Sequence, residues 1–112
     1  MPTVYATIPA DGAAEEMATT LVAERLAACV NAVDCRSTYR WDGQVETGEE
    51  TILLLKTTDA GYDRLKTRIE ELHPHDVPCI ERFDEADTLD RFATWIDDSD
   101  DRASDRNLEL RF

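Results

Sequence analysis

The sequence predicts an α+β fold: a four-stranded antiparallel sheet that carries two helices on one face, followed by an extra C-terminal helix. Two observations support this prediction. Hydrophobic patterns of period 2 and period 3.6 alternate along the 112 residues in the order βαββαβα. In addition, Asp42-Gly43 separates two long strand-like runs. This dipeptide is the strongest short signal for a β-hairpin, because both of its residues tolerate a positive φ.

The chain starts with a predicted strand and a predicted helix. Residues 3–8 alternate apolar and polar side chains, as a strand with one buried face does. Asp11 is expected to cap the next helix, and Glu15 and Glu16 in its first turn suit the helix dipole. Apolar residues at helical spacing extend this helix to about Ala28.

The predicted hairpin follows, with strands over residues 30–41 and from residue 44 through Lys56. Its second strand contains a continuous apolar run at residues 52–55. A strand with one wet face would alternate, so this run is expected to be covered on both faces. The helices of the same chain can cover one face, and another copy of the chain is the simplest cover for the other.

The remaining predicted elements are a helix, a short strand and a third helix. Asp59 is expected to cap the second helix, which ends at His73-Pro74 because proline disfavours helix in the preceding residue. Residues 77–83 form a short strand, in which Pro78 suits an edge position. Asp87 and Asp90 resemble a capping box for the third helix, whose apolar stripe runs over residues 89–96.

The chain is expected to form one domain over residues 1–98, with an acidic tail at residues 99–112. Within that tail, Leu108, Leu110 and Phe112 alternate in the pattern of a short final strand. The order βαββαβ is the split βαβ, ferredoxin-like arrangement. Two helices on one side of such a sheet leave its other face bare, which agrees with the need for a second copy.

The composition limits the classes of partner. The formal net charge is −13, from 25 acidic and 12 basic residues, which argues against nucleic acid and against anionic membranes. The only lysines are Lys56 and Lys66. So acidic and lysine-poor a chain is expected of a salt-adapted protein, because molar salt screens the self-repulsion of carboxylates. The chain shows no export signal, so a cytoplasmic location with three reduced cysteines is expected.

Several segments together resemble the CutA family of divalent-cation-tolerance proteins. The matching segments are residues 24–31 (ERLAACVN), the hairpin residues Tyr39, Trp41 and Gly43, the run ending at Thr58, Leu72-His73-Pro74 with Val77-Pro78, and Trp95-Ile96. The resemblance implies a homotrimer with intersubunit clefts, similar in architecture to PII-type signalling proteins. It also implies a role in tolerance of divalent metals, with copper as the usual candidate ligand. Cys35, His75 and Cys79 depart from the family's pattern.

The candidate metal ligands are Cys29, His73, His75 and Cys79. Imidazole and thiolate suit copper and zinc, and in an extended segment the last three would face one way. Their spacing is not that of a structural zinc motif. The alternative is purely structural: His73 ends a helix, His75 lies on the surface, and each cysteine is a small buried side chain.

A second set of candidates would line a cleft that binds a small anion. Lys56 ends a buried strand, so its charge must form an ion pair or bind an anionic ligand. Glu49 is a candidate partner for such an ion pair. Trp41 and Tyr39 are expected either in this cleft or at a subunit interface. The expected trimer interface comprises Tyr39, Trp41, Ile52 and Leu54.

Two functions remain from the sequence, beside a third option of a structural role with no small ligand. The first is a copper-binding, metal-tolerance trimer without an organic cofactor. The second is a PII-like regulatory trimer that binds an anionic ligand near Lys56 and signals to a protein partner. No enzyme is expected, because the sequence offers neither a nucleophile beside a histidine and an acid nor a Gly-rich phosphate loop.

Overall fold

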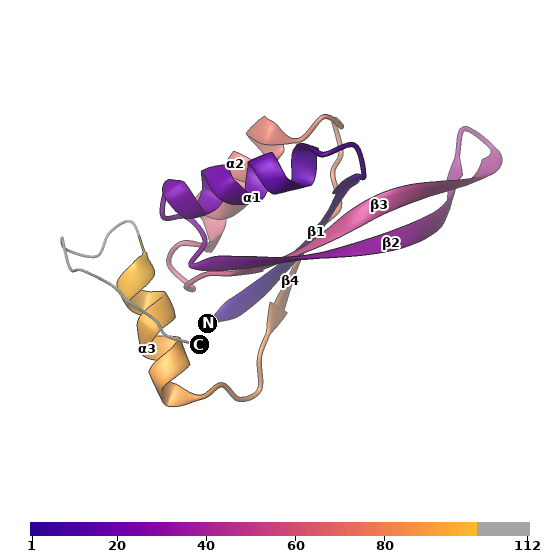
Figure 1. Cartoon of the computed structure of the whole chain (residues 1–112). Helices are drawn as coiled ribbons and strands as arrows, with labels where there is room; N and C mark the ends of the chain where they lie inside the picture. The colour runs from indigo at the N-terminus through magenta and orange to yellow at the C-terminus, as the bar shows by residue number, and fades with distance from the viewer. Residues whose placement is uncertain (101–112) are drawn as a thin grey trace.

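The predicted α+β, ferredoxin-like fold is confirmed in the computed structural model, which describes residues 1–100 (Figure 1). The C-terminal strand expected from Leu108, Leu110 and Phe112 lies outside the described residues. Within them the element order is β1 (Pro2–Pro9), α1 (Ala13–Ala23), β2 (Cys29–Trp41), β3 (Gln44–Lys56), α2 (Tyr62–Leu72), β4 (Ile80–Asp84) and α3 (Asp90–Ser99).

The sheet has the strand order β2-β3-β1-β4, and every neighbouring pair is antiparallel. β1 pairs with β3 only as far as Glu50, whereas β2 and β3 continue to pair up to Trp41 and Gln44. Residues 36–49 therefore project beyond the sheet as a two-stranded arm (Figure 1). Asp42 and Gly43 close the arm with φ of 50° and 75°, as predicted for this turn.

The core lies between the sheet and the helices α1 and α2. Val4 and Ile8 of β1 and Leu53 and Leu55 of β3 turn towards these helices and are almost completely buried. Leu21, Leu65 and Ile69 meet them from the helices. Burying each such side chain stabilises the fold by roughly 1.5–3 kcal/mol.

The other side of the sheet is the open face, which neither α1 nor α2 covers. Ile52 and Leu54 alternate with the buried leucines and are only half-buried on this side. Val33 and Phe83 share the open face, with 47% and 51% of their surface exposed. The apolar run at residues 52–55 is thus covered on one face by this chain and left available on the other.

Helix α1 ends at Ala23, about five residues before the predicted end. Arg25 adopts a φ of 60°, and the backbone N–H groups of Leu26 and Ala27 both return to the carbonyl of Leu21, at 3.0 and 3.2 Å. This left-handed C-terminal turn satisfies the last helical carbonyls. The leucine and alanine residues at 26–28, which led to the prediction of a longer helix, form instead a buried turn that leads into β2.

The predicted N-cap positions are also corrected, because Gly12, Gly61 and Leu89 occupy them without a side-chain cap bond. Asp11, one residue before the cap of α1, still accepts a hydrogen bond from the N–H of Ala13 at 3.1 Å. Asp59 instead pairs with Arg82 and with the N-terminal amine. Strand β4 begins at Ile80, three residues later than expected, and Pro78 lies in the preceding loop. The expected extended strand at residues 77–79 is therefore a loop next to an edge strand.

Candidate ligand groove

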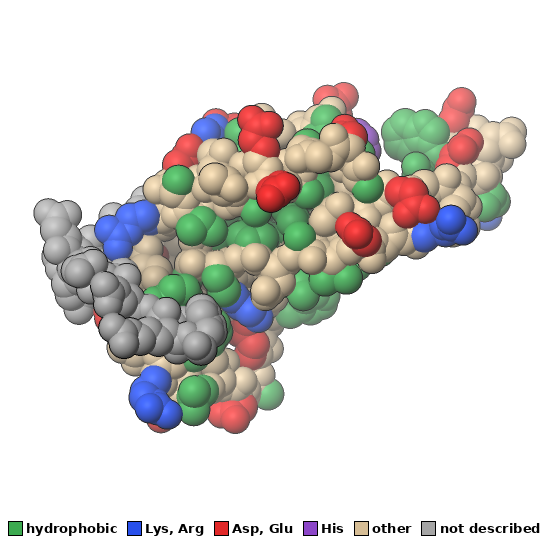
Figure 2. All heavy atoms as spheres, viewed as in Figure 1, with side chains coloured by type: hydrophobic (Ala, Val, Ile, Leu, Met, Phe, Trp, Pro, Cys, Tyr) green, Lys and Arg blue, Asp and Glu red, His purple; other side chains and the backbone are tan. Residues whose placement is uncertain are grey.

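A groove of about 1010 Å³ lies between the arm and the loop that joins α2 to β4. Figure 2 shows this side of the molecule as a notch, with histidine (purple) on the body and hydrophobic side chains (green) on the arm. Strand β1 and the start of β4 contribute its floor. It is lined by Tyr5, Thr7, Ser37, Tyr39, Trp41, Glu50, Pro74, His75, Asp76, Val77, Cys79 and Glu81.

His73 supports the rim of this groove. Its Nε2 lies 2.8 Å from the carbonyl oxygen of Thr7, and its Nδ1 accepts a hydrogen bond from the backbone N–H of His75 at 3.0 Å. A carbonyl only accepts and a backbone N–H only donates, so these bonds require the neutral ring with its proton on Nε2. Both ring nitrogens are thereby used in tying the loop to β1, which leaves neither of them free for a metal in this arrangement.

His75 and Cys79 both line the groove, as two members of the predicted ligand set. The Cys79 thiol lies 3.6 Å from Oε1 of Glu81. Burial raises the pKa of this thiol, and the negative charge of Glu81 raises it further, although a hydrogen bond with Thr7 acts in the opposite direction. At neutral pH Cys79 is therefore a protonated thiol that must lose its proton to bind a metal.

Cys29 lies at the opposite edge of the sheet from Cys79 and towards the other end of the strands. It pairs with Lys56 on the edge strand β2, whereas Cys79 precedes the opposite edge strand β4 and bonds through its carbonyl to Thr7. Three strand spacings alone separate the two strands by about 14 Å. Burial raises the pKa of the Cys29 thiol, and the Lys56 charge partly offsets this.

The four predicted metal ligands are consequently not brought together. His73 is engaged, Cys29 is remote, and only His75 and Cys79 share the groove. Within residues 1–100, no group of three or more His, Cys, Asp or Glu side chains has the arrangement to hold a metal ion. A complete site would need ligands from outside residues 1–100 of one chain.

The residues predicted to form a cleft around Lys56 also do not lie together. Lys56 donates to Oγ1 of Thr3 at 2.7 Å and lies 4.0 Å from the carboxylate of Glu85. Glu49, its expected partner, lies on the opposite face of β3 and pairs with Arg36 at 3.2 Å. The strand period of two explains the error, because residues 49 and 56 have opposite parity. Tyr39 and Trp41 line the groove, which contains neither Lys56 nor Glu49.

The groove is acidic. Its twelve lining residues include no lysine or arginine, and three carry carboxylates: Glu50, Asp76 and Glu81. Burial raises the pKa of the Tyr5 hydroxyl, and charge repulsion from Cys79, Cys35, Glu81 and Glu50, in that order, raises it further. With three carboxylates and no lysine or arginine in its lining, the groove is suited to a cation.

Sequence reasoning missed Tyr5, Thr7, Glu50 and Glu81 as groove residues. The alternation in residues 3–8 had already placed Tyr5 and Thr7 away from the core. Their meeting with Glu81 depends on β4 pairing beside β1, which only the tertiary topology supplies.

The family model of the CutA1 divalent ion tolerance protein matches residues 2–99. The chain belongs to this family. It is 42% identical to the divalent-cation tolerance protein CutA of Pyrococcus horikoshii over 93 residues, which cover 83% of this chain and 91% of that protein. It is also 42% identical to the protein of the same name from Thermus thermophilus, over 94 residues that cover the same shares of the two chains.

Solved CutA structures share the fold. The crystal structure of CutA1 from Pyrococcus horikoshii superimposes with a TM-score of 0.85 at 39% identity, covering 89% of this chain and 98% of that chain. The periplasmic divalent cation tolerance protein CutA from Archaeoglobus fulgidus gives a TM-score of 0.84 at 30% identity, covering 88% and 98%. Within residues 1–100 of the present CutA chain, no helix is both long and apolar enough to cross a membrane.

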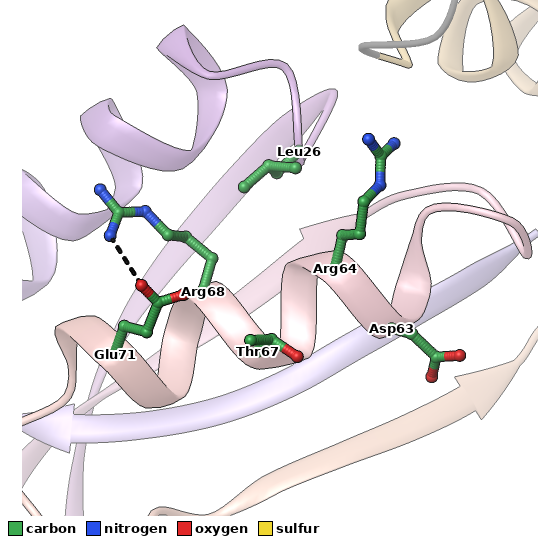
Figure 3. A pocket seen from close by; sticks show the side chains of 6 residues that line it. All are labelled: Leu26, Asp63, Arg64, Thr67, Arg68 and Glu71. Carbon is green, nitrogen blue, oxygen red and sulfur yellow. Dashed lines mark hydrogen bonds and ion pairs between the residues drawn. The ribbon is translucent and has the colours of Figure 1, made fainter.

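This CutA chain has a second, smaller hollow of about 370 Å³ on the outside of α2. Figure 3 shows Arg68 and Glu71 turned towards each other and Arg64 pointing away from Asp63. Arg68 binds both oxygens of Glu24, at 2.8 and 2.9 Å, and also meets Glu71 at 3.5 Å. Arg64 pairs with Asp100 at 3.4 Å. These arginines neutralise carboxylates of their own chain, so the hollow does not offer an anion a free cationic partner.

Proposed function

We propose that this CutA protein is a homotrimer that binds copper and so contributes to tolerance of divalent metal ions. Membership of the divalent ion tolerance family supports the metal-related role. The observation that carries the copper assignment is the presence of His75 and Cys79 in one acidic groove. Imidazole and thiolate ligands suit copper. The family is one of metal tolerance and not a known enzyme family, and we propose no catalytic activity.

The trimer is supported by the open face and the arm. Half-buried Ile52 and Leu54 lie beside exposed Val33 and Phe83, a contiguous apolar surface of the kind that marks a protein interface. A neighbouring copy on this face would also cover the side of the apolar run at residues 52–55 that the helices of the same chain leave exposed. We place Tyr39 and Trp41 at the margin of that contact, where the arm meets the groove.

The incomplete metal site fits the same proposal. One chain offers His75 and Cys79 with the carboxylate of Glu81 beside the thiol. A second copy seated on the open face would bring further side chains to the groove and complete the coordination. Cys29 and His73 are assigned structural roles.

The alternative of an anionic regulatory ligand is less well supported. Lys56 is engaged by Thr3 and Glu85, and the groove that contains Tyr39 and Trp41 carries three carboxylates. An anion would therefore meet negative potential in the groove. We propose a cytoplasmic location, in which the three thiols stay reduced and able to bind metal.

An anaerobic Cu(I) competition titration against a chromogenic chelator tests this function. We would run it in KCl at about 1 M, where carboxylate repulsion is screened. We expect a fixed ratio of copper per subunit, with binding lost in Cys79→Ser, weakened at least tenfold in His75→Ala and unchanged in Cys29→Ser. Because the pKa of Cys79 is raised, affinity should increase as pH rises through and above the ordinary thiol range. Equal weak binding in all variants would sink the proposal.

A further inference from the structure

We propose that the smaller hollow on the outside of α2 is the docking site of the chain's own C-terminal segment, residues 108–112. The hollow lies on the helical side of the molecule and not on the open face or the arm. The inference is therefore independent of copper binding and of the trimer contact. It rests on the place where the described chain ends, on the lining of the hollow and on the sequence of the segment.

The described chain ends at the rim of this hollow. Asp100 is only 9% exposed, accepts a hydrogen bond from the Thr58 hydroxyl at 2.6 Å and pairs with Arg64 at 3.4 Å. Arg64 is itself one of the residues that line the hollow. The CutA1 family model matches residues 2–99, so residues 101–112 lie beyond the matched domain and start beside the hollow.

The lining of the hollow suits apolar side chains. Leu26, in the turn after α1, is half-buried and contributes an apolar surface. In Figure 3 Leu26 and Thr67 lie between Arg68 on one side and Arg64 on the other. Both guanidinium groups are held by carboxylates, so the methylene stems of the two arginines are the part that can contact an occupant.

The segment has the pattern of an extended strand with one apolar side. Leu108, Leu110 and Phe112 share one parity, whereas Glu109 and Arg111 share the other. In an extended segment the first three point to one side and the two charged residues to the opposite side. Left in water, three such apolar side chains would favour association with other molecules. Docking covers them and keeps both charges in solvent.

The dimensions of the segment and the hollow also agree. An extended chain covers about 13 Å from residue 108 to residue 112. The hollow follows α2 from Arg64 to Glu71, a helical rise of about 10 Å. Residues 101–107, which are polar apart from Ala103, leave a connection of ordinary length in which the chain can turn back from Asp100 to the hollow.

Fluorine NMR of the full-length protein labelled with 4-fluorophenylalanine tests this docking. The chain has three phenylalanines, and Phe112→Leu identifies the signal of Phe112. Transfer from H₂O to D₂O shifts the signal of an exposed ring more than that of a buried ring. We expect the solvent shift of Phe112 to be no more than about half of its value in the urea-unfolded chain, because docking removes the ring from water.

Two substitutions should restore the solvent shift of Phe112 to nearly its unfolded value. Thr67→Trp places a large side chain inside the hollow at an exposed residue of α2, and Leu110→Ser removes an apolar contact from the segment. The matched controls are Thr19→Trp, at an exposed residue of α1 that does not line the hollow, and Glu109→Ser, on the other side of the segment. Both controls should leave the shift unchanged.

Far-UV circular dichroism and size-exclusion chromatography confirm that each variant stays folded and assembled. Three outcomes would each overturn the inference. A Phe112 ring as exposed as in the unfolded chain would show that the segment does not dock. A buried ring that does not respond to Thr67→Trp would place the segment on another surface. Equal responses to Thr67→Trp and Thr19→Trp would show a general effect of an added tryptophan.

Discussion

At the scale of single residues, the two neighbouring histidines have different roles. His73 bonds through both ring nitrogens to the backbone of Thr7 and His75, whereas the His75 ring lines the groove. Sequence spacing alone grouped them as metal ligands, because it shows which residues are near one another but not which ring atoms are already bonded. The hydrogen-bonding partners of His73 become visible only when β1 and the loop after α2 are brought together.

This difference predicts unequal effects of two matched substitutions on stability. His73→Ala leaves the Thr7 carbonyl and the His75 N–H without their partner, so it should lower the free energy of unfolding by about 1–3 kcal/mol. His75→Ala keeps its backbone N–H bond and should change stability by no more than about 0.5 kcal/mol. Denaturant unfolding at one fixed subunit concentration measures both values. Equal losses would show that His73 does not anchor the loop.

At the scale of elements, the C-terminal helix is held by a buried carboxylate. Ile96 of α3 is buried, and Asp100, directly after the helix, accepts a hydrogen bond from the Thr58 hydroxyl at 2.6 Å. Thr58 in turn accepts the backbone N–H of Gly61, the residue before α2. The end of α3 is thereby attached to the start of α2, although Thr58 and Asp100 lie 42 residues apart in sequence.

Gly61 is expected to be intolerant of any side chain for reasons of space. A Cβ at this position would lie 2.9 Å from Oγ1 of Thr58 and 3.1 Å from Oδ2 of Asp100. Its φ of −87° is open to all residues, so the cost is steric and not conformational. Gly61→Ala should lower the free energy of unfolding by about 1–3 kcal/mol. Gly48→Ala, where no atom lies within 4 Å, should be neutral or slightly stabilising. Thermal unfolding compares them, and equal midpoints would contradict this account.

The elements that could be predicted from the sequence are those with a strong local signal. The Asp42-Gly43 turn and the order of strands and helices needed only local pattern and turn chemistry. Helix ends were less predictable. The left-handed turn at Arg25 contains no glycine that would mark it in the sequence, and Asp59 forms an ion pair with Arg82 instead of capping α2. The groove could not be predicted as a whole, because its floor, arm and rim come from strands and a loop that meet only through sheet order.

At the scale of the whole molecule, the sheet has two unequal faces and a projecting arm. One face is sealed by α1 and α2, while the other keeps an apolar surface in a chain with a net charge of −13. In such a charged molecule an uncovered apolar surface would favour aggregation unless a specific contact covered it. A closed oligomer buries that surface and limits further association, because its symmetry leaves no free copy of the interface.

Leu54 is the residue with which to test this assembly. It lies in the middle of the open face, paired with Tyr5 on β1 and Asn31 on β2, and it does not belong to the core beneath the helices. Leu54→Arg places a charge in the proposed interface and should lower the stability of the single folded chain only slightly, so the trimer should dissociate.

Val22→Arg, on a 40% exposed residue of α1, adds the same charge on the helical side and should remain trimeric. Light scattering coupled to size exclusion gives the mass, and circular dichroism shows whether the dissociated chain stays folded. A Leu54→Arg variant that elutes with the mass of three subunits would place the interface elsewhere, and loss of assembly in both variants would point to a general effect of added charge.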